Sequence, residues 1–249
     1  MKTRTIEHKN LNGGKPFDFK YVITEDELDN QVYEILDSEE YAFEKKKDGV
    51  YIDLGANSGM ASLYFSQFAK KIYAIEPSPK VYETLVENTK HLKNVETFNL
   101  AWGVADREDF LFTDESKYEP QSFFSRVEFP RGVKVNTVKP STFFKENNIE
   151  HVDVMKVDIE ESEYLIFPDD DFGLIAPKID VIIGESHIQK DGGFPEIVPA
   201  LLERWGYKTI YPKLSHPNYF QTFTYNNLMT GQRLEAKYPR ETIFVAVKK

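Results

Sequence analysis

Two carboxylic acids end two apolar runs of this sequence, and a turn of small residues lies between them. Asp53 closes the run that begins at Val50, and Glu76 closes the run Lys-Ile-Tyr-Ala-Ile-Glu, 23 positions later. In an open α/β sheet, an acid about 20 residues beyond a glycine turn accepts hydrogen bonds from a ribose diol. The spacing therefore predicts a site for a nucleoside-containing cofactor, with Glu76 on the ribose and the following Pro77 beside it.

The turn itself reads Gly55, Ala56, Asn57, Ser58 and Gly59. Small residues let the backbone bend and approach a ligand closely. A turn that binds a pyrophosphate would have glycine in place of the asparagine.

The acid at the first strand end also separates the candidate cofactors. Asp53 would repel a diphosphate and would suit the ammonium group of an amino-acid tail. The turn thus favours S-adenosylmethionine over a nicotinamide dinucleotide, and a nicotinamide-dependent oxidoreductase is the alternative. A second alternative is a plain strand–helix–strand unit that binds no ligand, in which Asn57 or Ser58 is the N-cap of the helix.

A second group of ionisable residues follows two later apolar runs. Asp158 ends the run that starts at Val152, and Glu185 and His187 follow the run 179–183. Methyl transfer to an oxygen needs alignment and a general base. We expect His187 to be that base, oriented by Glu185, with Asp158 near the reacting end of the cofactor. An ordinary loop histidine is the alternative.

The same edge of the predicted sheet has the donor types of a hard-metal site. Asp158, Glu160, Glu185 and His187 offer carboxylates and one imidazole, which suit Mg²⁺ or Mn²⁺. Their spacing matches no metal signature, so the sequence favours a site without metal.

The elements that must position these residues alternate between short apolar runs and amphipathic segments. A strand is expected at each of the following ranges: 50–54, 71–75, 95–100, 152–159, 179–183, 207–211 and 243–247. Helices are expected after the glycine turn, from Ser78 onward, and at 141–147 and 195–205. Ala101 and Trp102 follow the third strand and are predicted to lie beside the adenine, although Trp102 also fits a core position.

Residues 104–150 are too long for a simple connection and predict an inserted hairpin, with strands at 110–113 and 133–138. The intervening segment is expected to be a loop that contacts substrate, and the aromatic stretch 212–231 is expected to be a long loop and a candidate lid. Residues 1–47 predict an N-terminal cap, built of a strand at 17–23 and a helix at 25–37. Residues 48–249 then form one cofactor-binding domain.

Bulk composition excludes some classes of function. The 249-residue chain carries a net charge of −10 and no cysteine. An acidic chain is poorly suited to sequence-independent binding of nucleic acid or of anionic membranes, and disulfides and thiolate metal sites are excluded. The N-terminus lacks the apolar stretch of a signal peptide, so a cytoplasmic protein is expected.

Two motifs together resemble one family. Asp-Leu-Gly-Ala-Asn-Ser-Gly with Glu76-Pro77, and the stretch Lys156-Val-Asp-Ile-Glu-Glu-Ser-Glu163, are similar to the FkbM family of class I S-adenosylmethionine-dependent methyltransferases, over roughly residues 48–188. The resemblance implies cofactor contacts at Gly55, Ala56, Asn57 and Glu76. It also implies an acidic motif at Asp158, Glu160 and Glu163, where the family usually has glycine in place of Glu161.

The expected fold is α/β and Rossmann-like: a seven-stranded, mostly parallel sheet with one antiparallel edge strand, helices on both faces and the inserted β-hairpin. The resemblance implies O-methylation of a hydroxyl on a small molecule or glycan. A catalytically inactive Rossmann-like binding module is the alternative outside the enzymes.

Overall fold

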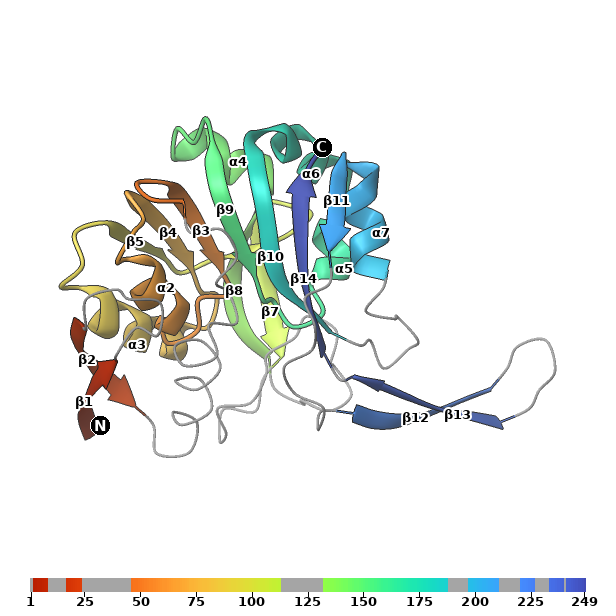
Figure 1. Ribbon diagram of the computed structural model, residues 1–249, viewed down its shortest axis with the longest axis horizontal. Helices are drawn as coiled ribbons and strands as arrows, with labels where there is room; N and C mark the ends of the chain where they lie inside the picture. Colours follow the sequence, from red (N-terminus) through yellow and green to blue (C-terminus); the bar gives the residue numbers. More distant parts are fainter. Residues whose placement is uncertain are drawn as a thin grey trace.

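The computed structural model describes residues 2–8, 17–23, 46–112, 132–187, 197–210, 220–226, 233–239 and 241–249. For 2–8, 17–23, 220–226, 233–239 and 241–243, and at the strand ends 112, 187 and 210, the description is of the backbone. These residues form a central sheet with helices on both faces, a smaller sheet and two separate hairpins (Figure 1).

The central sheet has seven strands in the order β11-β14-β10-β9-β3-β4-β5. Four neighbouring pairs, from β10 to β5, are parallel. The strands span the following residues: β3 Val50–Leu54, β4 Lys71–Ile75, β5 Val95–Phe98, β9 Val152–Val157, β10 Ile179–His187, β11 Tyr207–Ile210 and β14 Glu241–Lys248. The first of these in the sequence, β3, lies between β9 and β4 and is parallel to both, so the carboxyl ends of the three strands are neighbours.

One strand runs against the others, as expected, and it lies one place in from the edge. β14 is antiparallel both to β10 and to the outermost strand β11. In the dinucleotide-binding fold the corresponding half of the sheet continues with parallel strands. The reversed strand therefore separates this sheet from that fold and agrees with the predicted class.

Helices cover both faces because side chains alternate along each strand. On one face Tyr51, Val154 and Ile183 pack against α2 (Met60–Phe65), next to α3 (Pro79–Thr89). On the other face Ile52 and Met155 belong to the larger core cluster. That cluster includes residues of four helices: α4 Pro140–Glu146, α5 Glu163–Ile166, α6 Asp170–Ile175 and α7 Ile197–Arg204.

The predicted insertion is a hairpin extended by one short strand. β7 (Arg107–Phe112) and β8 (Gly132–Val138) pair antiparallel, and β6 (Ala101–Trp102) joins β8 in parallel. The sequence missed β6 because two residues give no periodicity to read. The segment between the two long strands lies outside the described residues.

Two further hairpins lie outside the central sheet. β1 (Lys2–His8) pairs with β2 (Phe17–Ile23), and β2 lies against α3. The predicted helix at 25–37 is outside the described residues. β12 (Phe220–Asn226) and β13 (Arg233–Pro239) form a hairpin that projects from the body in Figure 1. The prediction of a loop over 212–231 was wrong where β12 lies, since its alternating polar and aromatic residues are a strand pattern.

A 3-10 turn (η2, Ala176–Lys178) leads into β10. β10 itself is longer than predicted, because its last residues pair with β14 after β9 has ended. No helix among the described residues is long and apolar enough to cross a membrane.

Candidate functional site

The turn after β3 is held against the end of β4 by its own backbone. The N–H groups of Gly55 and Ala56 both donate to the carbonyl of Ile75, at 3.0 and 2.9 Å. The next N–H, of Asn57, donates to Oε2 of Glu76 at 3.0 Å. Asn57 is the exposed tip of the turn, whereas Ala56 and Ser58 are buried. The turn and the acid predicted from the sequence thus form one hydrogen-bonded unit.

Glu76 is buried and anchored at both oxygens. Its second oxygen, Oε1, accepts from the backbone N–H of Ser78 at 2.8 Å, and the residue is 7% exposed. Burial raises the pKa of Glu76 to about 7, although the N–H groups of Ser78 and Asn57 act in the opposite direction. Asn99 donates to the carbonyls of Glu76 and Pro77, which fixes the end of β4. Each carboxylate oxygen of Glu76 thus accepts one backbone hydrogen bond and retains capacity to accept another.

The two glycines of the turn are required by close packing as well as by backbone conformation. Gly55 has a φ of 78°, and a Cβ there would lie 1.7 Å from the carbonyl oxygen of Asp158. Gly59 has a φ of 95°, and its Cβ would lie 2.8 Å from Leu85 of α3. Gly59 therefore allows the start of α2 to pack closely on α3.

Asp53 lies at the end of β3, next to Lys156. Its side chain is fully buried; Oδ2 accepts a 2.6 Å hydrogen bond from Ser62 of α2, and Oδ1 lies 3.4 Å from Nζ of Lys156. This carboxylate has no exposed surface, and the groups next to its two oxygens belong to the protein. The structure therefore places the charge of Asp53 beside Lys156, and its contact with the ammonium group of the cofactor stays a prediction.

Lys156 is the cation at the centre of this site. It is the partner of Asp53 across β3 and β9, on the face covered by α2, and is 3% exposed. Its Nζ donates to the carbonyl of Gly55 at 2.6 Å and lies 3.5 Å from Oδ2 of Asp158. Burial alone lowers the pKa of Lys156, but Asp158, Asp53 and Glu185 outweigh burial and raise it. The ammonium form is therefore the stable one, which excludes Lys156 as a base at neutral pH.

The acidic segment after β9 has an unusual backbone. Asp158 is partly exposed beside the turn, and the next acids, Glu160 and Glu161, have φ values of 50° and 74°. Left-handed conformations are rare for glutamate, so two in succession mark a local strain. Glu163 is fully buried at the start of α5, where Oε1 accepts from the backbone N–H of Ile159 at 3.1 Å. This hydrogen bond connects the two ends of the segment 159–163.

The predicted base and its partner lie on the extension of β10. Ile183 pairs in register with Lys156, so positions 185 and 187, two and four residues on, lie on the same face of the sheet. Glu185 is partly exposed and acts on the charge of Lys156. At His187 the backbone pairs with Glu241 of β14. The structure brings Glu185 and the backbone at His187 to the same edge as Asp158.

Trp102 lies in the core. It is 3% exposed, and its ring packs 5.9 and 6.2 Å, centre to centre, from those of Phe143 and Phe144. Ala101 beside it is also buried. Stacking on an adenine needs one exposed face of the ring, so the burial of Trp102 favours the core position that the sequence also allowed. The Nε1–H of Trp102 has no hydrogen-bond partner among the described residues.

This geometry agrees with the comparisons to known proteins. The model of the "Methyltransferase FkbM domain" matches residues 53–209, well over half of the chain. The chain belongs to this FkbM family.

Other similarities to the FkbM chain are weaker. An uncharacterized protein of Methanothermobacter thermautotrophicus is 38% identical over 58 residues, which are 23% of each chain. The chain thus spans about a quarter of that relative's length. A precorrin-6y C5,15-methyltransferase from Geobacter metallireducens has 14% identity and a TM-score of 0.48, with 92% of this chain and 95% of that chain covered. A precorrin 8w decarboxylase from Methanobacterium thermoautotrophicum has 12% identity and a TM-score of 0.47, covering 92% and 94%.

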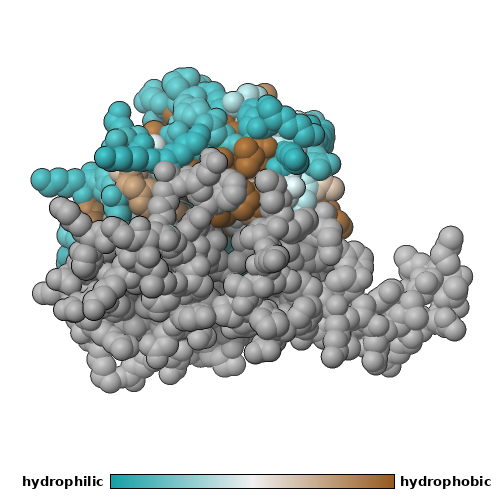
Figure 2. Space-filling view, viewed as in Figure 1, coloured by the Kyte–Doolittle hydropathy of each residue, from teal (hydrophilic) through white to brown (hydrophobic). Residues whose placement is uncertain are grey.

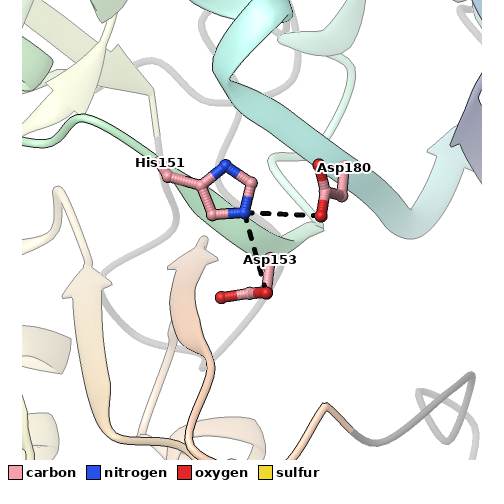
Figure 3. A group of neighbouring side chains, drawn as sticks. All are labelled: His151, Asp153 and Asp180. Carbon is pink, nitrogen blue, oxygen red and sulfur yellow. Dashed lines mark ion pairs between the residues drawn. The ribbon is translucent and has the colours of Figure 1, made fainter.

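The only described residues that could together hold a metal ion lie far from the acids of the FkbM motif. They are His151, Asp153 and Asp180, near the starts of β9 and β10 (Figure 3). Nε2 of His151 lies 3.7 Å from Asp153 and 3.4 Å from Asp180, but Nζ of Lys46 already lies 2.7 Å from Asp180. A lysine ammonium thus already balances the charge that a metal would have to neutralise. The strands β9 and β10 begin at the top of Figure 1, and the top of the molecule is largely hydrophilic in the same view in Figure 2.

Sequence reasoning missed Lys156, Ser62 and Asn99. The signal for Lys156 was present: a charged residue inside the apolar run Val-Asp-Val-Met-Lys-Val, two positions before an acid, has to be paired if the strand is central. Ser62 and Asn99 are ordinary polar residues in sequence, and only the packing of α2 and of the chain after β5 gives them their partners.

Proposed function

We propose that this protein transfers a methyl group from S-adenosylmethionine to a hydroxyl group of a small molecule or glycan. Membership of the FkbM family supports the cofactor and the reaction class. The hydroxyl acceptor is the finer part of the proposal and rests on the chemistry of the residues at the site.

One observation carries the proposal: the carboxylate of Glu76 is buried against the glycine turn and bonded to the N–H of Asn57. A carboxylate in this place can accept hydrogen bonds from the two hydroxyls of a ribose, while the adjoining turn lies along the rest of the nucleoside. The order of the strands, with β14 reversed, argues against a nicotinamide dinucleotide at the same edge.

The transfer itself needs a base that lies near the methyl group. The acceptor oxygen attacks the methyl carbon, the carbon–sulfur bond breaks with its electron pair on sulfur, and S-adenosylhomocysteine leaves. The hydroxyl proton passes to a base. Of the described carboxylates at this edge, Asp158 is proposed to lie near the reacting end of the cofactor and Glu185 to orient His187, which remains our candidate base on the same strand. Lys156 stays protonated, and its positive charge stabilises the ionised forms of Asp53, Asp158 and Glu185.

The charges at this edge favour an uncharged acceptor. Among the described residues, Asp158, Glu160, Glu161 and Glu185 are partly exposed acids there, whereas Lys156 beside them is buried. Such an edge repels phosphorylated or carboxylated acceptors and suits polyhydroxyl compounds, whose groups donate hydrogen bonds to carboxylates.

The cofactor is tested by calorimetry with S-adenosylmethionine and S-adenosylhomocysteine. Glu76→Ala should weaken binding about tenfold or more, because the ribose loses a charged acceptor and the turn loses the partner of Asn57. Glu96→Ala is the matched control: this glutamate lies on the neighbouring strand β5 and pairs with Lys71 at an exposed site. Unchanged affinity in the Glu76 variant would contradict the assignment.

The acceptor is tested with a panel of glycans and small alcohols, with formation of S-adenosylhomocysteine as the readout. Neutral polyhydroxyl compounds should be methylated, and their phosphorylated forms should be poorer acceptors. His187→Ala should lower turnover more than cofactor affinity, and a chelator should leave turnover intact. Binding of the cofactor without turnover on any acceptor would favour the inactive binding module.

A further inference from the structure

Lys156 connects three neighbouring elements at the edge where the parallel strands end. Its ammonium donates to the carbonyl of Gly55 in the turn after β3 and lies 3.5 Å from Asp158 after β9. It also lies 3.4 Å from Asp53 at the end of β3, and the charge of Glu185 on β10 acts on it. A lysine ammonium has three N–H donors, and the hydrogen bonds to Gly55 and Asp158 use two of them.

Neutralising Asp53 is the simplest role that such a lysine can have. That role needs only the contact with Asp53, which also accepts from Ser62. The contact with Gly55 goes beyond it. At 2.6 Å this hydrogen bond is shorter than the distances from Lys156 to either aspartate, and it fixes the direction of a carbonyl in the turn itself.

The conformation of the turn at Gly55 depends on its fit against the chain after β9. Gly55 has a left-handed φ, and its Cα lies so close to the chain after β9 that an added Cβ would meet the carbonyl of Asp158 at 1.7 Å. The positions of Gly55 and Asp158 are therefore linked, and Lys156 is bonded to both. A change at Lys156 will move the turn and Asp158 together.

We propose that Lys156 is a positioning residue for the cofactor: it holds the turn at Gly55 and the carboxylate of Asp158 in the arrangement that binds the adenosyl group and its methyl donor. The inference rests on the proposed function, since it concerns the same cofactor. Lys156 is buried, so it acts through these two groups and not by touching the ligand.

The test is a double-variant cycle that separates positioning from charge balance. Lys156→Met leaves Asp53 as a buried, uncompensated charge, so this variant should lose both stability and cofactor affinity. Asp53→Asn with Lys156→Met removes both charges and keeps an acceptor for Ser62. This double variant should regain much of the thermal stability, yet still bind S-adenosylmethionine about tenfold or more weakly than wild type.

Lys46→Met is the matched control. Lys46 also lies between two aspartates, Asp180 and Asp153, but at the opposite edge of the sheet and partly exposed. Its loss should leave cofactor affinity within about twofold of wild type. An equal loss in the Lys46 variant would mean that the effect at Lys156 is a general consequence of removing a lysine.

A second measurement keeps the inference testable if the methionine variant folds poorly. The chain contains no cysteine, so a Lys156→Cys variant can be alkylated at this one position in denaturant and refolded. An aminoethyl group restores an ammonium at the length of lysine, whereas a propyl group gives the same length without charge. Affinity should return with the aminoethyl group and not with the propyl group, measured in the Asp53→Asn background as well.

The outcomes distinguish the two levels of the argument. If wild type binds neither S-adenosylmethionine nor S-adenosylhomocysteine, the proposed function is wrong, and this inference with it. If wild type binds and the double variant binds equally well, Lys156 only balances Asp53, and the inference alone is wrong. Equal affinity of the propyl and aminoethyl proteins would also overturn it.

Discussion

The two edges of the central sheet each hold a lysine between two aspartates, and they differ in burial. At the edge where the parallel strands begin, Lys46 lies near Asp180 and Asp153, and its side chain is 34% exposed. At the edge where they end, Lys156 lies between Asp53 and Asp158 with a side chain 4% exposed. The exposed pairs gain little from their charges, whereas the buried ammonium cannot be removed without leaving a charge unpaired.

The difference shows where this fold concentrates its constraints. At the beginning edge, the partners of Lys46 can exchange with water, so the network there is a tolerant surface feature. At the ending edge, the ammonium of Lys156 and the carboxylate of Asp53 are both buried, so water cannot replace a partner that either of them loses. A lysine and its aspartates thus form a solvated ion pair near the start of β9 and a buried ion pair, packed against the turn, near its end.

The two glycines that flank β3 test this comparison most strongly. Gly55→Ala, at the ending edge, should lower the free energy of unfolding by about 3 kcal/mol or more, because its Cβ would meet a backbone oxygen at 1.7 Å in a left-handed conformation. Gly49→Ala, at the beginning edge, should cost about 1 kcal/mol or less. Its Cβ would lie 3.0 Å from the backbone oxygen of Lys46 and from the ring of Tyr51, so these neighbours need to move by only a few tenths of an ångström.

Urea unfolding followed by circular dichroism measures both changes. The comparison fails if the two variants lose similar stability, since that would mean the turn after β3 can relax as easily as the residue before it.

The sequence predicted the parallel core well because its signals there are local. The bounds of β3 and β4 match the prediction, and Ser78 with Pro79 begins α3 as expected. A short apolar run that ends in an acid, followed by glycine, allows few other conformations. The position of Glu76 beside the turn followed from the same spacing.

The roles of Asp53 and Trp102 could not be read in the same way. An acid at a strand end can face a ligand or a buried cation, and the choice depends on Lys156, about 100 residues later in the chain. A tryptophan after the third strand can stack on a base or pack on the phenylalanines of α4, and the sequence around Trp102 does not distinguish these two environments. Only the packing of the folded chain shows which one it occupies. Long-range partners of single polar or aromatic residues leave no periodicity in the sequence.

Glu76 gives a second test, because it is a buried acid that accepts backbone hydrogen bonds. Its pKa rises from an ordinary 4.5 to about 7, chiefly through burial. Between these values the folded protein keeps a proton that the unfolded chain has lost. The free energy of unfolding should therefore fall as the pH rises from about 4.5 to about 7, and Glu76→Gln should remove that part of the fall.

The control for this slope lies at the other edge. Asp153 also accepts a backbone hydrogen bond, from Val50 at 2.8 Å, and Asp153→Asn removes a carboxylate there. Urea unfolding at several pH values should show the wild-type slope in the Asp153 variant and a smaller slope in the Glu76 variant. An unchanged slope in Glu76→Gln would show that this carboxyl is not the titrating group.

Cofactor binding should shift the same equilibrium. Ribose hydroxyls donate to the ionised carboxylate and favour it, so binding of S-adenosylmethionine should release protons below about pH 7 and weaken as the pH falls. Calorimetry in two buffers with different ionisation enthalpies measures the protons released. Proton release that persists in Glu76→Gln would assign the linkage to another group.

The smallest effect concerns the left-handed residues at the two edges. Before β3 and β9 they are Asp48 and Asn148, which belong to the types that tolerate this conformation, whereas after β9 they are Glu160 and Glu161. Glu161→Gly should raise the free energy of unfolding by about 0.5–1 kcal/mol, because relief of the strain exceeds the entropy that glycine adds to the unfolded chain. Asn148→Gly should change it by a few tenths of a kcal/mol at most.

Both variants are compared by urea unfolding at one pH and by calorimetry with S-adenosylmethionine. If the Glu161 variant is less stable than wild type, the glutamate side chain stabilises the segment by more than its backbone strain costs. If it is more stable but binds the cofactor more weakly, the strained backbone is itself part of the arrangement beside Asp158. That result would mean that the strained backbone at Glu161 contributes to cofactor binding, as we infer for the buried charge of Lys156.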